Sequence, residues 1–209
     1  MARFHTSTGA FVGITKLPNV FRSGFQAANR RLFGVIPRLP WIPFAAQRAI
    51  SKVLTKNFSV WEIGAGFSTL WLAERVNHVV SIEASREWFD RLQTIISHES
   101  ISNIDLRFEW QAEKMASFSE LPDMSIDLLF IDGGPRGACL ANGFAKVRPG
   151  GYLYLDNWDS KHFWEDQVDF PTKYASKLTS CVSLVDFVPG QVGVYEGLLL
   201  QKASSHHID

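Results

Sequence analysis

From residue 58 onward, short apolar runs alternate with longer segments whose apolar residues recur at helical spacing. Such runs suit strands buried on both faces, and the intervening segments suit helices packed on those faces. Strand–helix alternation predicts a parallel sheet covered by helices on both sides. We expect strands in FSVWEIGA (58–65), HVVSIEAS (78–85), IDLRFEWQA (104–112), SIDLLFIDGG (125–134) and YLYLDN (152–157).

Two further apolar runs, 181–189 and 192–202, are joined around Gly190 with too few residues between them for a helix. Two strands joined by a short turn must be antiparallel. The pattern therefore predicts an α/β fold with a Rossmann-like, doubly wound, mostly parallel seven-stranded sheet that ends in an antiparallel hairpin. We place this domain at residues 44–202 and a C-terminal tail at 203–209.

Residues 1–43 do not follow this alternation and are expected to form a basic arm or lid, partly helical and partly irregular. Segment 20–33 predicts an amphipathic helix with Phe21, Phe25 and Leu32 roughly on one side. Residues 1–61 contain nine Lys or Arg and no Asp or Glu, which leaves 12 basic and 21 acidic residues, a charge of about −9, on the remainder.

This charge asymmetry has several interpretations. The arm could pack on its own acidic domain, bind a membrane surface, nucleic acid or an anionic substrate, act as a targeting segment, or join copies into a homo-oligomer. Five aromatic residues, one in the arm and four within the domain, could also form an apolar lid over a bound substrate. The candidates are Trp41, Phe44, Trp158, Phe163 and Trp164.

Composition places the 209-residue chain among ordinary globular proteins, with 46% hydrophobic and 20% charged residues and a net charge of zero. No apolar stretch reaches the roughly 18 residues of a transmembrane segment, and we expect none. The sequence also carries no strong nucleic-acid signal. Two cysteines, Cys139 and Cys181, cannot make a disulfide framework, so we expect a reducing, cytoplasmic setting.

The turn after the first predicted strand has two glycines one residue apart, Gly64 and Gly66. The third glycine of a dinucleotide-binding turn would fall on Thr69, so that pattern is broken. Glu62 before the turn suits an ammonium group, and Glu83 at the end of the second strand suits the hydroxyls of a ribose. An amino-acid nucleoside, which brings both a carboxylate and an ammonium, fits better than a dinucleotide.

The motifs EIGAG (62–66), FIDGG (130–134) and RPGGYLYLDN (148–157), together with Glu83, resemble those of class I S-adenosylmethionine-dependent methyltransferases, especially small-molecule O-methyltransferases. The resemblance covers about residues 44–202. It implies that the cofactor is S-adenosyl-L-methionine and that the residues of the turn after the first strand line its methionine end. The implied cofactor site consists of Glu62, Gly64, Ala65, Gly66, Ser68, Thr69, Glu83, Ala84, Ala112, Glu113 and Asp132.

Asp132, Asp156 and Asn157 also match the residues that bind a divalent cation in O-methyltransferases of the catechol type. The resemblance therefore implies a Mg²⁺ site at these three residues. The lysine that usually follows the fourth-strand Asp in those enzymes is missing, and Arg136 stands nearby. Either the base is elsewhere, with His162 as a candidate, or the metal assignment fails. The candidate catalytic residues are thus Asp132, which would face the sulfonium and the substrate, and His162.

We therefore expect an S-adenosylmethionine-dependent methyltransferase that methylates a hydroxyl of a small molecule or carbohydrate by in-line transfer. Two alternatives stay open. One is an NAD-type oxidoreductase on a related sheet. The other is a non-catalytic protein of the same fold, recruited to a partner through its basic arm.

Overall fold

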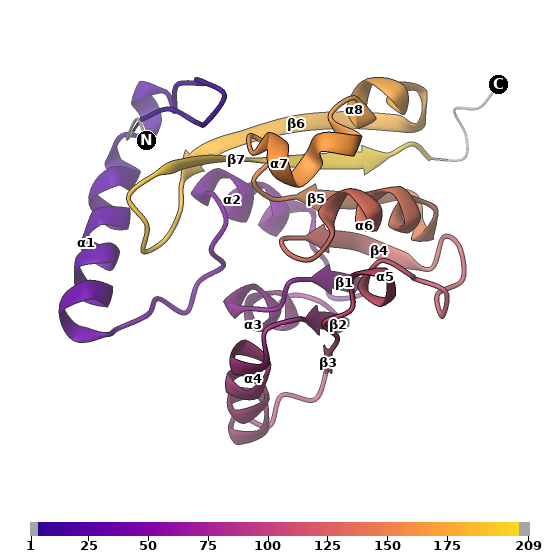
Figure 1. The fold of residues 1–209 in the computed structure, drawn as a ribbon, viewed down its shortest axis with the longest axis horizontal. Coiled ribbons are helices and arrows are strands. Elements are labelled where there is room, and N and C mark those ends of the chain that lie inside the picture. The colour runs from indigo at the N-terminus through magenta and orange to yellow at the C-terminus, as the bar shows by residue number, and fades with distance from the viewer. Residues whose placement is uncertain (1–3, 205–209) are drawn as a thin grey trace.

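The computed structural model describes residues 4–204, which form a seven-stranded sheet with helices on both sides (Figure 1). The strands are β1 (Ser59–Ile63), β2 (His78–Glu83), β3 (Ile104–Phe108), β4 (Ile126–Ile131), β5 (Val147–Leu155), β6 (Leu178–Phe187) and β7 (Val194–Lys202). Their order across the sheet is β3-β2-β1-β4-β5-β7-β6. Strands β1 to β5 run parallel, and β7 lies antiparallel between β5 and β6. The predicted fold class is confirmed.

The helices are longest at the beginning of the chain and shortest near its end. The α-helices are α1 (Pro18–Phe33), α2 (Phe44–Val53), α3 (Phe67–Ala73), α4 (Arg86–His98), α5 (Ala112–Met115), α6 (Arg136–Gly143), α7 (Lys161–Trp164) and α8 (Phe170–Lys173). Segment 160–178, expected to be helix-like, is divided into α7, α8 and two 3₁₀ turns. Pro171 at the start of α8 contributes to this division, because proline cannot continue a preceding helix.

The third strand is shorter than the sequence suggests. It ends at Phe108, and the Glu109 carboxylate accepts a hydrogen bond from the backbone N–H of Gln111 at 2.9 Å. This local turn diverts the backbone from the ladder, as acidic side chains often do in loops. Helix α5 then begins at Ala112.

Alternating strand residues feed two separate cores, one on each side of the sheet. In β1, Trp61 and Ile63 pack with α5, α6, α7 and α8, whereas Val60 packs with α2 and α3. Figure 1 shows these two helix layers on opposite sides of the strands. Each fully buried side chain of this kind contributes roughly 1.5–3 kcal/mol relative to an exposed one. The two cores hold the ends of the parallel strands at one common edge.

The N-terminal arm packs along the outer strand β6 of its own chain. Asn19 Nδ2 donates to both carboxylate oxygens of buried Asp186, at 2.9 and 3.0 Å. Ser23 Oγ donates to the backbone carbonyl of Val188 at 3.1 Å. Of the interpretations of the arm's charge, the structure thus shows packing on the acidic domain.

The predicted C-terminal tail at 203–209 lies outside the described residues from 205 onward. No helix within residues 4–204 has the length and apolar character needed to cross a membrane.

Candidate active site

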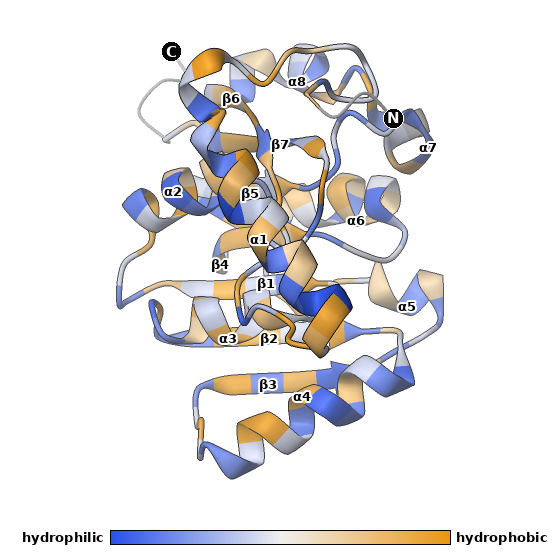
Figure 2. Cartoon of the chain, turned by 90° about the vertical axis from the view of Figure 1, so that its left-hand side faces the viewer, coloured by the Kyte–Doolittle hydropathy of each residue, from blue (hydrophilic) through white to orange (hydrophobic). Residues whose placement is uncertain are grey.

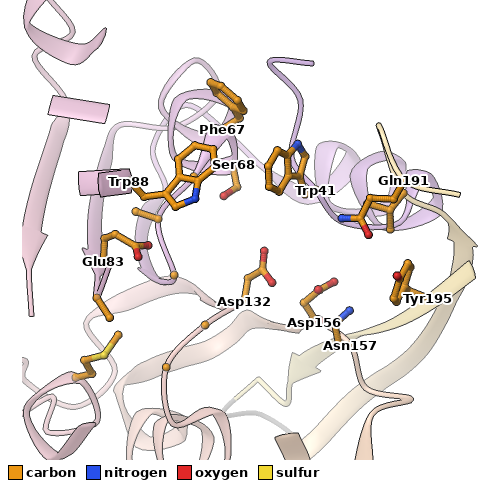
Figure 3. Close-up of a pocket in the computed structure, with 18 residues that line it drawn as sticks. Trp41, Phe67, Ser68, Glu83, Trp88, Asp132, Asp156, Asn157, Gln191 and Tyr195 are labelled. Atoms are coloured by element: carbon orange, nitrogen blue, oxygen red, sulfur yellow. The ribbon is translucent and has the colours of Figure 1, made fainter. Parts of the chain in front are cut away.

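A cavity of about 380 Å³ opens at the carboxyl ends of the parallel strands (Figure 3). Its volume is within the range of small-molecule sites, and its position is where ligands bind in doubly wound sheets. Many of the predicted site residues lie on its wall. They are Gly64, Ala65, Gly66, Ser68, Glu83, Ala84, Asp132, Asp156 and Asn157.

The floor of the cavity is a close approach of the loops that follow β1 and β4. Gly64 has φ +91°, and a Cβ added there would lie 2.7 Å from the backbone nitrogen of Gly133. The contact therefore needs glycine for its backbone conformation and for its lack of a side chain. Gly66, at φ −168°, has ordinary extended backbone, and its Cβ would meet Ser68 Oγ at 3.6 Å.

Glu62 and Thr69 lie behind this turn, away from the cavity wall. Glu62 is fully buried, and its Oε2 accepts from Thr69 Oγ1 at 2.6 Å and from Ser81 Oγ at 2.5 Å. Thr69 Oγ1 also accepts from the backbone N–H of Gly66 at 3.1 Å. Burial raises the pKa of Glu62 to about 7, although these hydroxyl hydrogen bonds oppose the increase. In the structure, Glu62 supports the turn from below.

Glu83 closes β2 and lies on the cavity wall. Its Oε1 accepts a hydrogen bond from the backbone N–H of Ser85 at 2.6 Å, which orients the carboxylate. Burial raises the pKa of Glu83, and backbone hydrogen bonds partly offset this effect. A buried acceptor on the cavity wall at the second strand end suits a pair of vicinal hydroxyl groups, as the sequence predicts for the ribose.

Three aromatic rings cover the cavity above Glu83 and Asp132. The Trp41 and Trp88 ring centroids are 5.4 Å apart, and those of Phe67 and Trp88 are 5.8 Å apart, both in edge-to-face geometry. They come from the arm, from α4 and from the start of α3 (Figure 3). Of the aromatic residues expected to form a lid, Trp41 alone lines this cavity, whereas Phe44 and Trp164 are buried in the cores.

Two carboxyl groups meet at the ends of β4 and β5. Figure 3 shows the side chains of Asp132 and Asp156 next to each other in the cavity. Burial and the Asp156 carboxylate raise the pKa of Asp132 well above its usual range, against the effect of Arg136. Burial also raises the pKa of Asp156, but Arg136 and the Tyr154 hydroxyl, which donates to Asp156 Oδ1 at 2.6 Å, limit the increase. The pair therefore favours sharing one proton.

Arg136 provides a buried positive charge beside this pair. Its Nη2 lies 3.4 Å from Asp132 Oδ1 and donates to the Asp132 backbone carbonyl at 2.7 Å. Nη1 donates to the backbone carbonyl of Asp156. The guanidinium thus ties the ends of β4 and β5 together and neutralises part of their negative charge.

These contacts fit the predicted Mg²⁺ site poorly. The Tyr154 hydroxyl already donates a hydrogen bond to Asp156. The Arg136 guanidinium already balances part of the negative charge of Asp132 that would attract a divalent cation. Among residues 4–204, no group of three or more His, Cys, Asp or Glu is placed to hold a metal ion. The structure therefore does not support a magnesium ion on Asp132, Asp156 and Asn157.

Three other predicted residues lie elsewhere. Ala112 and Glu113 are exposed on α5, and Met115 of the same helix reaches the cavity instead. His162 is exposed on α7, with its ring 5.7 Å from that of Phe163, and does not line the cavity. Of the two candidate catalytic residues, Asp132 therefore lies on the cavity wall and His162 does not.

The opposite wall is formed by residues that the sequence did not identify. Val188, Gln191 and Tyr195 belong to the β6–β7 hairpin. No motif marks them, because their position depends on β7 lying between β5 and β6 and not on local spacing. The aromatic residues Phe67 and Trp88 were likewise missed, although both follow predicted strand ends closely enough to have been considered.

The sequence and the fold were compared with known proteins. Residues 61–158 match the family model described as "Methyltransferase domain". No curated protein matches the sequence significantly. One similar solved structure is the O-methyltransferase TomG from Streptomyces achromogenes, which is involved in tomaymycin synthesis and was solved with S-adenosylmethionine. It is 18% identical to this chain in sequence, and the alignment covers 88% of this chain and 90% of TomG with a TM-score of 0.61.

Two other solved structures share the fold, one an O-methyltransferase and the other an rRNA methylase. An O-methyltransferase from Bacillus cereus, solved with S-adenosylhomocysteine, is 18% identical over 87% of this chain and 98% of that chain, with a TM-score of 0.58. An rRNA methylase from Streptococcus thermophilus is 14% identical over 76% and 95%, with a TM-score of 0.57. At these identities the likeness shows the fold. Together with the family match, it favours the methyltransferase expectation over an NAD-type oxidoreductase or a non-catalytic protein.

Proposed function

We propose that this chain, whose residues 61–158 match a methyltransferase domain model, is a class I S-adenosylmethionine-dependent methyltransferase that methylates a hydroxyl group of a small molecule or carbohydrate. The observation that carries the proposal is the carboxyl pair of Asp132 and Asp156 inside a cavity of small-molecule size. Asp132 has 22% of its side chain exposed, so an acceptor hydroxyl can reach it.

The cofactor, when bound, supplies an electrophilic methyl group and leaves as a neutral thioether. When the proton shared by the pair rests on Asp156, the acceptor hydroxyl donates a hydrogen bond to the ionised Asp132, and its proton passes to that carboxylate as the new oxygen–carbon bond forms. A carboxylate whose pKa is raised accepts this proton better than an ordinary surface aspartate. Arg136 holds the two strand ends, and thereby both carboxyl groups, in place.

The cavity walls also favour a small acceptor. Trp41 and Trp88 cover one side, and Tyr195 and Gln191 stand on the other, so the reacting group would be enclosed by aromatic and amide side chains. The carboxyl groups on the wall are those of Glu83, Asp132 and Asp156, and the described residues that line the cavity include no Lys, Arg or His. A polyphosphate backbone would be repelled by such a wall.

Thermal unfolding separates the cofactor classes at low cost. Saturating S-adenosylhomocysteine and S-adenosylmethionine should raise the melting temperature, since a ligand that binds the native state stabilises it by mass action. NAD should leave it unchanged. Stabilisation by NAD without stabilisation by S-adenosylhomocysteine would contradict the cofactor assignment.

The acceptor and the base are tested with radiolabelled methyl transfer to 3,4-dihydroxybenzoate, glucose and a short RNA. We expect transfer to a hydroxyl compound, and an Asp132→Asn variant should lose roughly 10²-fold or more in turnover while still binding S-adenosylhomocysteine. Glu113→Gln, the exposed α5 position, is the matched control and should retain activity. Transfer to RNA alone would refute the acceptor class, and an active Asp132→Asn enzyme would refute the role of this carboxylate.

A further inference from the structure

Helix α1 is amphipathic, but its apolar side points away from the protein. Phe21, Phe25, Leu32 and Phe33 have 79%, 70%, 71% and 73% of their surface exposed. We call these four residues the outer face of α1. Figure 2 shows the helix in front of the body of the protein, with apolar residues visible along it and at its C-terminal end.

The inner side of the same helix is mostly polar, although Val20 packs against the buried cluster of Val12, Phe44, Phe187 and Val194. The one buried residue of the helix is Ser23, 1% exposed, and it and Asn19 make the hydrogen bonds to Val188 and Asp186. A helix that covers a single domain normally shows the reverse arrangement, with its apolar stripe inward. The polar contacts fix which side of α1 faces the body, so the outward direction of the phenylalanines is built into the docking of the helix.

We infer that the outer face of α1 is the contact surface between two copies of this chain. A twofold-symmetric dimer uses the same patch on both subunits, so a single apolar helix face is sufficient to build it. This inference concerns assembly and does not depend on the proposed reaction.

The exposed area supports a second copy as the occupant. At about 150 Å² for each large apolar side chain, the outer face offers roughly 600 Å². Ile14 and Val35, just before and just after the helix, are 76% and 58% exposed and extend the apolar surface at both ends. A stable interface buries about 800 Å² on each partner. An apolar patch of this size is at the upper end of what a typical monomer exposes and is often functional.

The position of the charges favours a protein partner over an anionic membrane. The guanidinium groups of Arg22 and Arg30 lie 4.6 and 4.8 Å from the ring centroids of Phe44 and Trp41 of the same chain. Cations that strengthen membrane binding would instead flank the apolar face and meet the lipid headgroups. Two copies of a chain with zero net charge also have little overall electrostatic repulsion to overcome.

The dimer contact would also support the cavity. The inner side of α1 holds Val188 through Ser23, and Arg30 stacks on Trp41; Val188 and Trp41 both line the cavity. Packing α1 against a second copy would therefore stabilise one wall of the site from outside.

Sedimentation velocity of the full chain tests the inference. The wild-type protein should sediment as a dimer of the 23.5 kDa chain, and the double variant Phe21→Asp/Phe25→Asp as a monomer. Trp110→Asp, at a residue 68% exposed in the loop after β3, is the matched control and should stay dimeric. Circular dichroism should show native secondary structure in all three proteins, because every altered side chain is exposed.

Thermal unfolding supplies a second readout. Across about a hundredfold range of protein concentration, the melting temperature should rise with concentration for the wild type and stay constant for the double variant. A monomeric wild type, or a double variant that remains dimeric, would overturn the inference. A monomer that co-sediments with phosphatidylserine vesicles through Phe21 and Phe25 would replace it with a membrane contact.

Discussion

The buried carboxyl of Glu62 makes the stability of this fold depend on pH in a direction that can be measured. The group lies at the end of β1 with no exposed surface, and among the described residues its Oε1 finds no hydrogen-bond partner. Its other oxygen accepts from Thr69 and Ser81. Ionising such a group in the native state is unfavourable because its hydration is lost.

The size of the effect follows from the pKa. Burial raises the pKa of Glu62 from 4.5 to about 7. Below about pH 4.5 the group is protonated in the native and the unfolded chain, and it costs nothing. As the pH rises to 7 the unfolded chain loses this proton first, so stability falls. Above pH 7 the full cost is reached, about 3 kcal/mol at about 1.4 kcal/mol for each pKa unit.

Glu62→Gln removes this titration and keeps the shape of the side chain. We expect the difference in unfolding free energy between variant and wild type, measured by urea denaturation without cofactor, to shift in favour of the variant by about 3 kcal/mol between about pH 4.5 and pH 8. The amide N–H₂ of the glutamine could stay unpaired, but that cost is the same at both pH values and cancels.

Glu113→Gln makes the same chemical change at an exposed position of α5 and serves as the control. The difference in unfolding free energy between Glu113→Gln and the wild type should not change with pH by more than a few tenths of a kcal/mol. A shift below about 1 kcal/mol for Glu62→Gln would mean that Glu62 ionises in the native state near its ordinary pKa, and the argument from burial would be refuted.

Three other expectations test the packing. Gly64→Ala places a Cβ 2.7 Å from a backbone nitrogen at a positive φ and should lower the free energy of unfolding, measured by urea denaturation, by about 2–4 kcal/mol. Gly66→Ala, whose Cβ first meets an atom at 3.6 Å, should lower it by less than about 1 kcal/mol. Equal losses of stability would contradict the close approach at Gly64. Asp186→Ala removes the buried carboxylate that binds the arm and should lower stability by roughly 3 kcal/mol and speed proteolysis within residues 4–43; an unchanged cleavage rate would argue against this anchor. A thiol reagent should modify exposed Cys181 and spare Cys139 in the native protein, because burial raises the pKa of the Cys139 thiol to about 12; mass spectrometry of the labelled peptides distinguishes the two.

Much of the fold was predictable because its signals are local. Apolar runs, helical spacing and the short link around Gly190 were enough to predict the parallel sheet and its terminal hairpin. The cavity wall formed by Gly64, Glu83 and Asp132 was also predictable, since parallel strands bring their carboxyl ends to one edge.

The remaining features depend on contacts between distant segments. Glu62 was expected to face the cofactor, but strand alternation and the hydroxyls of Thr69 and Ser81 place it behind the turn. The Mg²⁺ site was predicted without knowing that Arg136 donates hydrogen bonds to the backbone carbonyls of both Asp132 and Asp156. No spacing rule reveals such a contact, because it requires the tertiary position of both strands.

The docking of the arm on β6 has a consequence for the order of folding. Asn19 and Ser23 make their contacts with residues 167 and 165 positions later in the chain. During synthesis, α1 therefore leaves the ribosome long before the strand that receives it exists, and closing so long a loop is entropically costly. Until β6 and β7 complete the sheet, Asn19 and Ser23 lack the partners that dock the arm, and the apolar face of α1 stays undirected. We therefore expect arm docking to be the final step of folding and the step most exposed to aggregation.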